Sequence, residues 1–239
     1  MTKTENNCGM DKIREHLTTA NGSPWCWLFY GDSITHGAKH THGWRSFPEI
    51  FAERLRWEIS YTHDVVINTG ISGHNTESLL AGYDWRVRHW HPHVVFVLIG
   101  TNDIIKLNDI VLYKSNLHKL LDLIQEDNAI PILQTYPTIQ YIADNLNYVK
   151  RFNEMPAYNQ TIKDVAKERN VILVDHEKYW KENASDPDTL ASWLGEPIHP
   201  GARGHLEMAK AIFMELGIFD PEALSCNPIG TPFSVPPVK

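Results

Sequence analysis

Five short apolar runs alternate along the chain with longer stretches in which apolar residues recur every three or four positions. The short runs are rich in Val, Ile and Phe, and such near-continuous apolarity is typical of strands covered on both faces. They predict strands over residues 25–30, 64–68, 93–99, 130–135 and 171–174.

The longer stretches predict helices, because their apolar positions would fall on one helical face. The clearest sets are Tyr113, Leu117, Leu120, Leu121 and Ile124, and then Leu206, Ala209, Phe213 and Leu216. Further helices are predicted around residues 44–57, 76–82 and 155–169.

The alternation of strand and helix predicts a parallel sheet joined by right-handed crossovers. The fold class is therefore α/β, a three-layer α/β/α sandwich with five strands, and 2-1-3-4-5 is the favoured strand order. In that order the first and third strands are neighbours. The crevice outside their carboxyl ends is where such sheets bind ligands.

A length of 239 residues with 42% hydrophobic content suits one well-buried core. We expect an N-terminal extension over residues 1–24 with at most one short helix, and a single domain over 25–219. Residues 220–239 are rich in Pro and predict an irregular tail.

The formal net charge of -7 disfavours nucleic acid and anionic membranes as partners. No apolar run approaches the roughly 20 residues of a membrane span, so stable membrane insertion is not expected. The polar first 21 residues lack the apolar core of a signal peptide, which favours a cytoplasmic location. Three scattered Cys residues predict neither a disulfide framework nor a thiolate metal site.

Four polar clusters could meet at one edge of the predicted sheet, and the first three each follow a strand-like apolar run. They are Gly31-Asp32-Ser33-Ile34, Gly70-Ile71-Ser72-Gly73, Gly100-Thr101-Asn102-Asp103 and Glu196-Pro197-Ile198-His199-Pro200. Together they contain a hydroxyl, an imidazole and a carboxylate, the groups that nucleophilic catalysis by serine requires.

In this interpretation Ser33 is the nucleophile and His199 is the general base. Glu196 lies three residues before His199, so its carboxylate can orient the imidazole from the same loop. The backbone N–H groups of Ser33 and Gly73 and the side-chain amide of Asn102 are the candidate oxyanion donors.

These clusters resemble the four sequence blocks of the SGNH, or GDSL-type, hydrolase family, in the family's order and over most of the chain. The resemblance implies a flavodoxin-like fold, no metal or organic cofactor, and hydrolysis of esters or thioesters through an acyl-serine. It implies catalytic roles for Ser33 and His199, and oxyanion roles for Ser33, Gly73 and Asn102. One departure is that the family usually has Asp where this chain has Glu196.

Other interpretations stay open at this point. The serine could cap a helix, Asn102 could do the same, and Glu196 could be a solvated loop residue. An α/β-hydrolase elbow is disfavoured because Thr35 stands where the second Gly of G-x-S-x-G belongs. Acidic residues Asp32 and Asp103 are interpreted as organising loops rather than as catalysts.

The 13 histidines raise the question of a metal site. Two groups lie close together in the sequence, namely His36, His40 and His42, and then His89, His91 and His93. Neither group has the spacing of a zinc site. The first group could line a substrate mouth. The aromatic residues Trp44, Tyr83, Trp85 and Trp90 are expected in the core or a pocket wall, where one or two could stack on a sugar.

The sequence thus predicts a cofactor-independent serine esterase for short-acyl esters, with acetyl esters of carbohydrates as candidate substrates. The same groups would serve a lysophospholipase, a thioesterase or an acyltransferase. A catalytically silent carbohydrate-binding protein is the alternative from another class. The sequence does not specify the oligomeric state.

Overall fold

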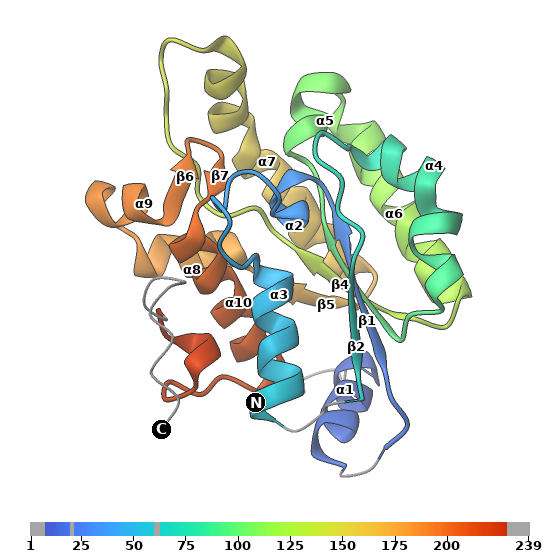
Figure 1. Ribbon diagram of the computed structural model, residues 1–239. Coiled ribbons are helices and arrows are strands. Elements are labelled where there is room, and N and C mark those ends of the chain that lie inside the picture. The colour runs from blue at the N-terminus through green and yellow to red at the C-terminus, as the bar shows by residue number, and fades with distance from the viewer. Residues whose placement is uncertain (1–7, 20–21, 60–62, 229–239) are drawn as a thin grey trace, which may run out of the picture.

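A parallel sheet of five strands forms the centre of the structure (Figure 1), a computed structural model that describes residues 8–19, 22–59 and 63–228. The strands are β1 (Cys26–Gly31), β2 (Val65–Asn68), β3 (Val94–Leu98), β4 (Ile130–Gln134) and β5 (Ile172–Val174). Their order is β2-β1-β3-β4-β5, and every neighbouring pair is parallel. The predicted three-layer α/β sandwich and its strand order are therefore confirmed.

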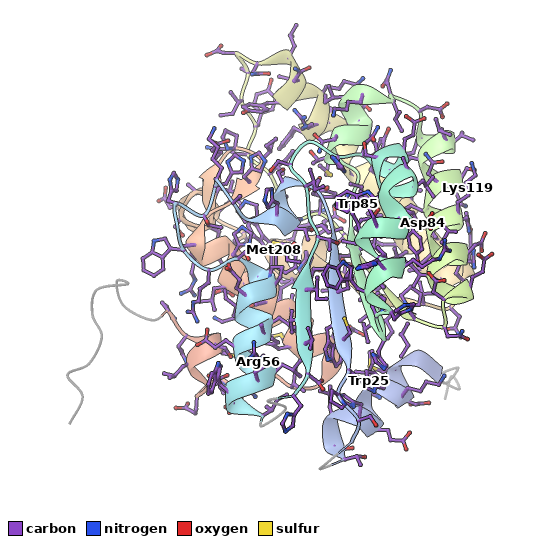
Figure 2. All side chains as sticks on the ribbon, turned by 45° about the vertical axis from the view of Figure 1, so that its right-hand side comes forward. Trp25, Arg56, Asp84, Trp85, Lys119 and Met208 are labelled. Carbon is purple, nitrogen blue, oxygen red and sulfur yellow. The ribbon has the colours of Figure 1, made fainter. Side chains whose placement is uncertain are left out.

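Helices cover both faces of the sheet (Figure 1). In the described residues they are α1 (Cys8–Thr18), α2 (Ser33–His36), α3 (Phe47–Glu53), α4 (Thr76–Arg86), α5 (Thr101–Lys106), α6 (Ile110–Glu126), α7 (Leu146–Glu168), α8 (His176–Asn183), α9 (Pro187–Trp193) and α10 (Ala202–Leu216). Helices α3, α8 and α10 lie on one side of the sheet, and α4, α6 and α7 lie on the other. Figure 2 shows Asp84 and Lys119 on the outward sides of α4 and α6. Shorter turns are the π-helical η1 (Arg54–Glu58), which continues α3, and the 3-10 turns η2 (Arg88–Trp90) and η3 (Leu224–Cys226).

Alternate side chains of β1 pack against opposite helical layers, as a strand period of two requires. Phe29 stacks on its register partner Phe96 at 4.4 Å and meets Phe51 of α3 at 5.3 Å. The next residue, Tyr30, packs against Tyr83 of α4 and donates its hydroxyl to the backbone of that helix. Continuous apolarity in β1 therefore reflects burial on both faces.

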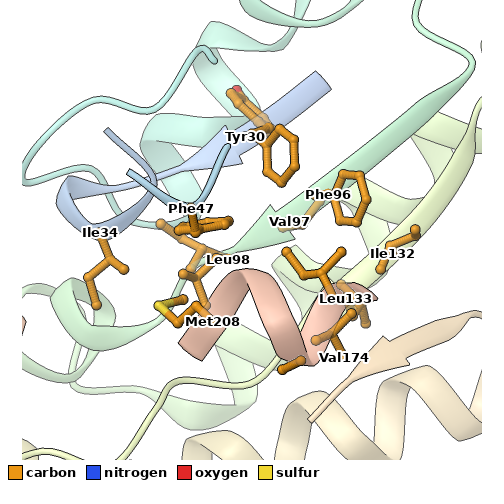
Figure 3. Packing of buried hydrophobic residues seen from close by; sticks show 14 of the residues in the cluster. Tyr30, Ile34, Phe47, Phe96, Val97, Leu98, Ile132, Leu133, Val174 and Met208 are labelled. Atoms are coloured by element: carbon orange, nitrogen blue, oxygen red, sulfur yellow. The ribbon is translucent and has the colours of Figure 1, made fainter. Parts of the chain in front are cut away.

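Figure 3 shows the part of the core beneath the carboxyl edge of the sheet, where Phe47 of α3 and Met208 of α10 lie next to Leu98 of β3. All three side chains are fully buried. Burial of one such side chain contributes roughly 1.5–3 kcal/mol to folding. This packing fixes the strand ends from which the polar clusters emerge.

The N-terminal extension contains the single short helix that the sequence predicts. Met10 and Ile13 of α1 are buried, and His16 Nε2 lies 2.7 Å from Asp64 Oδ2. At the other end, residues 220–228 contain η3, whose Ser225 N–H donates to Glu58 at 2.9 Å. The remainder of the predicted tail, 229–239, lies outside the described residues.

Several elements were not predicted, because they are too short or too polar to show the apolar periodicity of a helix or strand. These are α5, α8, α9 and a hairpin of β6 (Leu194–Glu196) with β7 (His199–Pro200). Helix α7 also begins nine residues earlier than predicted, in a polar stretch before Pro156. In the described ranges no helix combines the length and the apolarity of a membrane span.

The prediction that Trp85 and Trp90 lie in the core or a pocket wall is wrong. Trp85, labelled in Figure 2, is 63% exposed and Trp90 is 45% exposed. Their positions fall on the solvent side of α4 and in η2, and an apolar residue type alone does not determine which way a side chain points.

A side chain at Gly31 would disrupt the end of β1, because a Cβ there would overlap Thr35 Oγ1 and the Leu98 carbonyl oxygen. We expect Gly31→Ala to lower the free energy of unfolding by about 1–3 kcal/mol in urea titrations. The matched control is Gly22→Ala, whose Cβ would meet its nearest neighbours at 3.8 Å and should change little. Equal, small effects in both variants would contradict this account.

Candidate active site

Ser33 is the first residue of α2, and Asp32 alone separates it from the end of β1. Asp32 caps this short helix by accepting the Ile34 N–H at 3.0 Å, and Gly37 ends it with a left-handed φ of 66°. Ser33 lies at the carboxyl edge of the sheet and is only 8% exposed. The loop therefore holds the hydroxyl in a defined position.

His199 reaches Ser33 from the far end of the chain. It lies in β7, which pairs with β6 in an antiparallel hairpin and contacts α2. The His199 Nε2 atom is 2.9 Å from Ser33 Oγ, a hydrogen-bond distance. The structure thus brings together the predicted nucleophile and the predicted base.

Glu196 is the register partner of His199 in the hairpin. Its Oε2 lies 3.4 Å from His199 Nδ1, which is ion-pair distance, but the alignment is outside hydrogen-bond geometry. The other oxygen, Oε1, lies 3.2 Å from His40 Nδ1, also at ion-pair distance and also outside hydrogen-bond geometry. The carboxylate is therefore close to two imidazoles at once.

The candidate oxyanion donors come from the ends of three neighbouring strands. Within the described part of the chain, the N–H groups of Ser33 and Gly73 have no hydrogen-bond acceptor. Gly73 has a φ of 83°, and Lys106 Nζ donates to its carbonyl at 2.6 Å. Asn102 Nδ2 donates to His74 O at 2.9 Å, and its second contact, to Asp32 Oδ2, is long at 3.5 Å.

Burial and neighbouring charges set the protonation of the hairpin residues. Burial lowers the pKa of His199 to about 4, with a further lowering from His40 and an opposing effect of Glu196. Burial alone would raise the pKa of Glu196, but His40 and then His199 outweigh it and lower that pKa. At neutral pH the imidazole of His199 is thus free to accept a proton, and Glu196 is ionised.

Asp32 and Asp103 organise loops, as interpreted from the sequence. Burial raises the pKa of Asp32 to about 7, against the opposing hydrogen bonds from Tyr136 and Ile34. Asp103 accepts the Thr76 N–H at 3.0 Å, and burial raises its pKa to about 6. Neither carboxylate is bonded to His199.

Tyr136 is a residue of the site that sequence reasoning missed. Its hydroxyl donates a short hydrogen bond to Asp32 Oδ2, and both groups are fully buried. Because Tyr136 follows β4, beside β3, the strand order was the signal that could have placed it at this edge.

Arg86 of α4 was also missed, since the predicted helix ended at residue 82. Its buried guanidinium donates to Thr69 O at 3.0 Å and lies 2.7 Å from His74 Nδ1. It also contacts Gly31 O at 3.3 Å and covers the Tyr30 ring at 4.5 Å. This side chain ties the end of β1 to the loop that carries Gly73.

The other histidines fall into separate environments. His36 lies 3.1 Å from Ser72 Oγ, His42 is exposed, and His93 accepts the Cys26 N–H at the opposite edge of the sheet. His205 is buried, stacks on Phe47 and accepts its N–H at 3.1 Å.

Across residues 8–19, 22–59 and 63–228, one group of potential metal ligands lies within 4.8 Å, namely His40, Glu196 and His199. The two imidazoles are stacked 3.4 Å apart at an angle of 10°. Their Nδ1 lone pairs lie in parallel ring planes and do not converge on one point. This geometry does not fit a tetrahedral zinc site.

A serine hydrogen-bonded to a histidine at the carboxyl edge of a 2-1-3-4-5 sheet defines a hydrolase of the serine type. Residues 29–206 match the sequence profile of the GDSL-like lipase/acylhydrolase family. The chain belongs to this family and is a carboxylic ester hydrolase.

The relatives include an acetylxylan esterase of Geobacillus stearothermophilus, which is 28% identical over 207 residues covering 80% of this chain and 93% of that protein. A crystal structure of an acetylxylan esterase from the same organism has a TM-score of 0.68 at 23% identity, covering 83% of this chain and 96% of the other. An alpha/beta hydrolase from the metagenome of Lake Arreo, Spain, has a TM-score of 0.70 at 20% identity, covering 83% and 98%. These structural matches support the fold.

The hydroxyl of Tyr136 should matter for stability, because it satisfies a buried oxygen of Asp32. We expect Tyr136→Phe to lower the free energy of unfolding by about 1–3 kcal/mol in urea titrations. Tyr141→Phe, at a residue that is 52% exposed, is the matched control. An unchanged unfolding midpoint in Tyr136→Phe would show that the hydrogen bond contributes nothing.

Proposed function

We propose that this chain hydrolyses acetyl and other short-acyl esters of carbohydrates through an acyl-serine intermediate. The observation that carries the proposal is the 2.9 Å contact between Ser33 Oγ and His199 Nε2. The acetylxylan esterase among the relatives supports the carbohydrate substrate.

In the first half of the reaction, His199 Nε2 removes the proton from Ser33 as its oxygen attacks the ester carbonyl. The oxyanion of the tetrahedral intermediate lies among the N–H groups of Ser33 and Gly73 and the amide of Asn102. Loss of one such donor typically costs about 3–4 kcal/mol of transition-state stabilisation. The amide of Asn102 can give its second hydrogen, because its present contact to Asp32 is long.

The imidazolium of His199 then protonates the leaving alcohol, which departs and leaves the acyl group on Ser33. In the second half, His199 deprotonates a water that attacks the acyl carbonyl, and Ser33 is restored. Glu196 stabilises the imidazolium in both halves. In the Geobacillus esterase, variants that replace a serine, a histidine and an aspartate three residues before that histidine are described as catalytic mutants.

Hydrolysis of p-nitrophenyl esters from acetate to dodecanoate tests the nucleophile and the acyl length. We expect Ser33→Ala to lower kcat/KM for the acetate by about a thousandfold or more, because the hydroxyl that contacts the base is lost. Ser72→Ala is the matched control at the same edge of the sheet, since Ser72 contacts His36 instead. Unchanged activity in Ser33→Ala would exclude Ser33 as the nucleophile.

The same series separates the remaining activities. A steep fall beyond butyrate supports a short-acyl esterase, whereas preference for dodecanoate supports a lysophospholipase or long-chain thioesterase. Acetate release from an acetylated xylo-oligosaccharide tests the carbohydrate substrate directly. Predominant acetyl transfer to an added sugar would identify an acyltransferase instead.

The pH profile should reflect the lowered pKa of His199, about 4. Hydrolysis needs the neutral imidazole, so a lowered pKa keeps the base active as the pH falls through the ordinary histidine value of about 6.5. We expect kcat/KM for p-nitrophenyl acetate to hold below that value and to fall only as the pH approaches the lowered pKa. An acid limb centred at or above the ordinary value would contradict this expectation.

A further inference from the structure

His40 stacks face to face on His199, although neither the sequence blocks nor the mechanism above gives it a role. The ring centroids are 3.4 Å apart and the ring planes differ by 10°. His40 Nδ1 lies 3.2 Å and His199 Nδ1 lies 3.4 Å from oxygens of the Glu196 carboxylate, both at ion-pair distance and both outside hydrogen-bond alignment. The Glu196 carboxylate thus faces two parallel imidazoles, one oxygen to each.

The backbone holds His40 in this place from two sides. In its own loop, Thr41 Oγ1 donates to Gly37 O at 2.8 Å, directly after α2. From the hairpin, Gly195 lies so close that a Cβ there would be 2.6 Å from the His40 carbonyl oxygen. The loop can pack against the hairpin because Gly195 has no side chain.

We propose that His40 is a positioning residue, which binds Oε1 of Glu196 so that Oε2 stays directed at the catalytic imidazole of His199. The inference rests on the proposed function and deepens its mechanism. The Nδ1 atom of His40 acts through the carboxylate rather than on Ser33, while the His40 ring stacks on that of His199.

The length of the Glu196 side chain makes such a support necessary. Glu has one more rotatable bond than Asp, so an unsupported carboxylate loses more rotamer freedom when it is held in one place. Its side chain is 35% exposed, whereas His40 and His199 are each 12% exposed. His40 fixes Oε1, the carboxylate oxygen that does not face His199. This support explains how Glu196 can replace the shorter Asp of the Geobacillus esterase.

Stacking adds a second effect on the same base. The His40 ring covers one face of the His199 imidazole at a centroid distance of 3.4 Å, and His40 lowers the pKa of His199. Substitutions that keep the ring and remove Nδ1 therefore separate the carboxylate contact from the stacking contact.

The test is a double-mutant cycle between His40 and Glu196, measured as kcat and KM for p-nitrophenyl acetate. We expect His40→Phe, which keeps a stacked ring without the N–H, to lower kcat about 10-fold with KM changed less than about 2-fold. His40→Asn supplies an amide N–H near the lost position and should recover part of the lost kcat. In a Glu196→Ala background, His40→Phe should change kcat less than about 2-fold, because no carboxylate remains to be held.

The matched control is His42→Asn, at an exposed histidine of the same loop with a φ of 53°, which Asn tolerates. If His40→Phe fails to fold, Glu196→Asp provides the second route. A carboxylate one methylene shorter cannot reach both rings, so His40→Ala should lower kcat less in that background than it does in the parent.

Equal losses in kcat from His40→Phe in the parent and in Glu196→Ala would overturn the proposal, as would an unchanged kcat or a loss confined to KM. Failure of the proposed function is a separate outcome. It would appear as hydrolysis retained in Ser33→Ala, whereas failure of this inference alone leaves hydrolysis dependent on Ser33 and independent of the His40–Glu196 pair.

Discussion

The contact between Ser33 and His199 is the interaction on which the rest of the site depends, and it joins residues 166 positions apart in the chain. No local structure can bring such residues together. The parallel sheet does so, because it delivers the ends of β1, β2 and β3 to one edge and leaves the β6–β7 hairpin to close over them. The surrounding core acts mainly to keep that edge in register.

A second set of polar contacts holds the loops around this site in place and takes no part in the proposed reaction. Asp32 joins the cap of α2 to Tyr136 beyond β4, while Arg86 joins the end of β1 to the loop after β2. Asp32 and Arg86 are ionisable side chains buried away from water. Each has several hydrogen-bond partners, because a buried polar group without partners destabilises the fold. The geometry of the candidate oxyanion donors follows from these bonds as much as from the glycines.

Much of the fold could be predicted from the sequence, because strands buried on both faces leave continuous apolar runs and the first three polar clusters each follow such a run. The fourth cluster follows α9, which was not predicted. The pairing of Glu196 with His199 could be predicted from their spacing alone. The contacts of Tyr136, Arg86 and His40 were not predicted, since each depends on which strands, helices and loops become neighbours in space. For Tyr136 the predicted strand order indicates the edge of the sheet but not the bond to Asp32. Trp85 was predicted to be buried from its residue type, but it is exposed, because the orientation of α4 determines which of its residues face solvent.

The separation of Ser33 and His199 along the chain has a consequence for synthesis. At 5–20 residues per second, roughly 10–30 s pass between translation of the serine and of its partner imidazole. Helix α10, which covers one face of the sheet, is made later still. A growing polypeptide therefore carries an inert hydroxyl and an uncovered apolar face until its last third emerges, so esterase chemistry and protection from aggregation begin together.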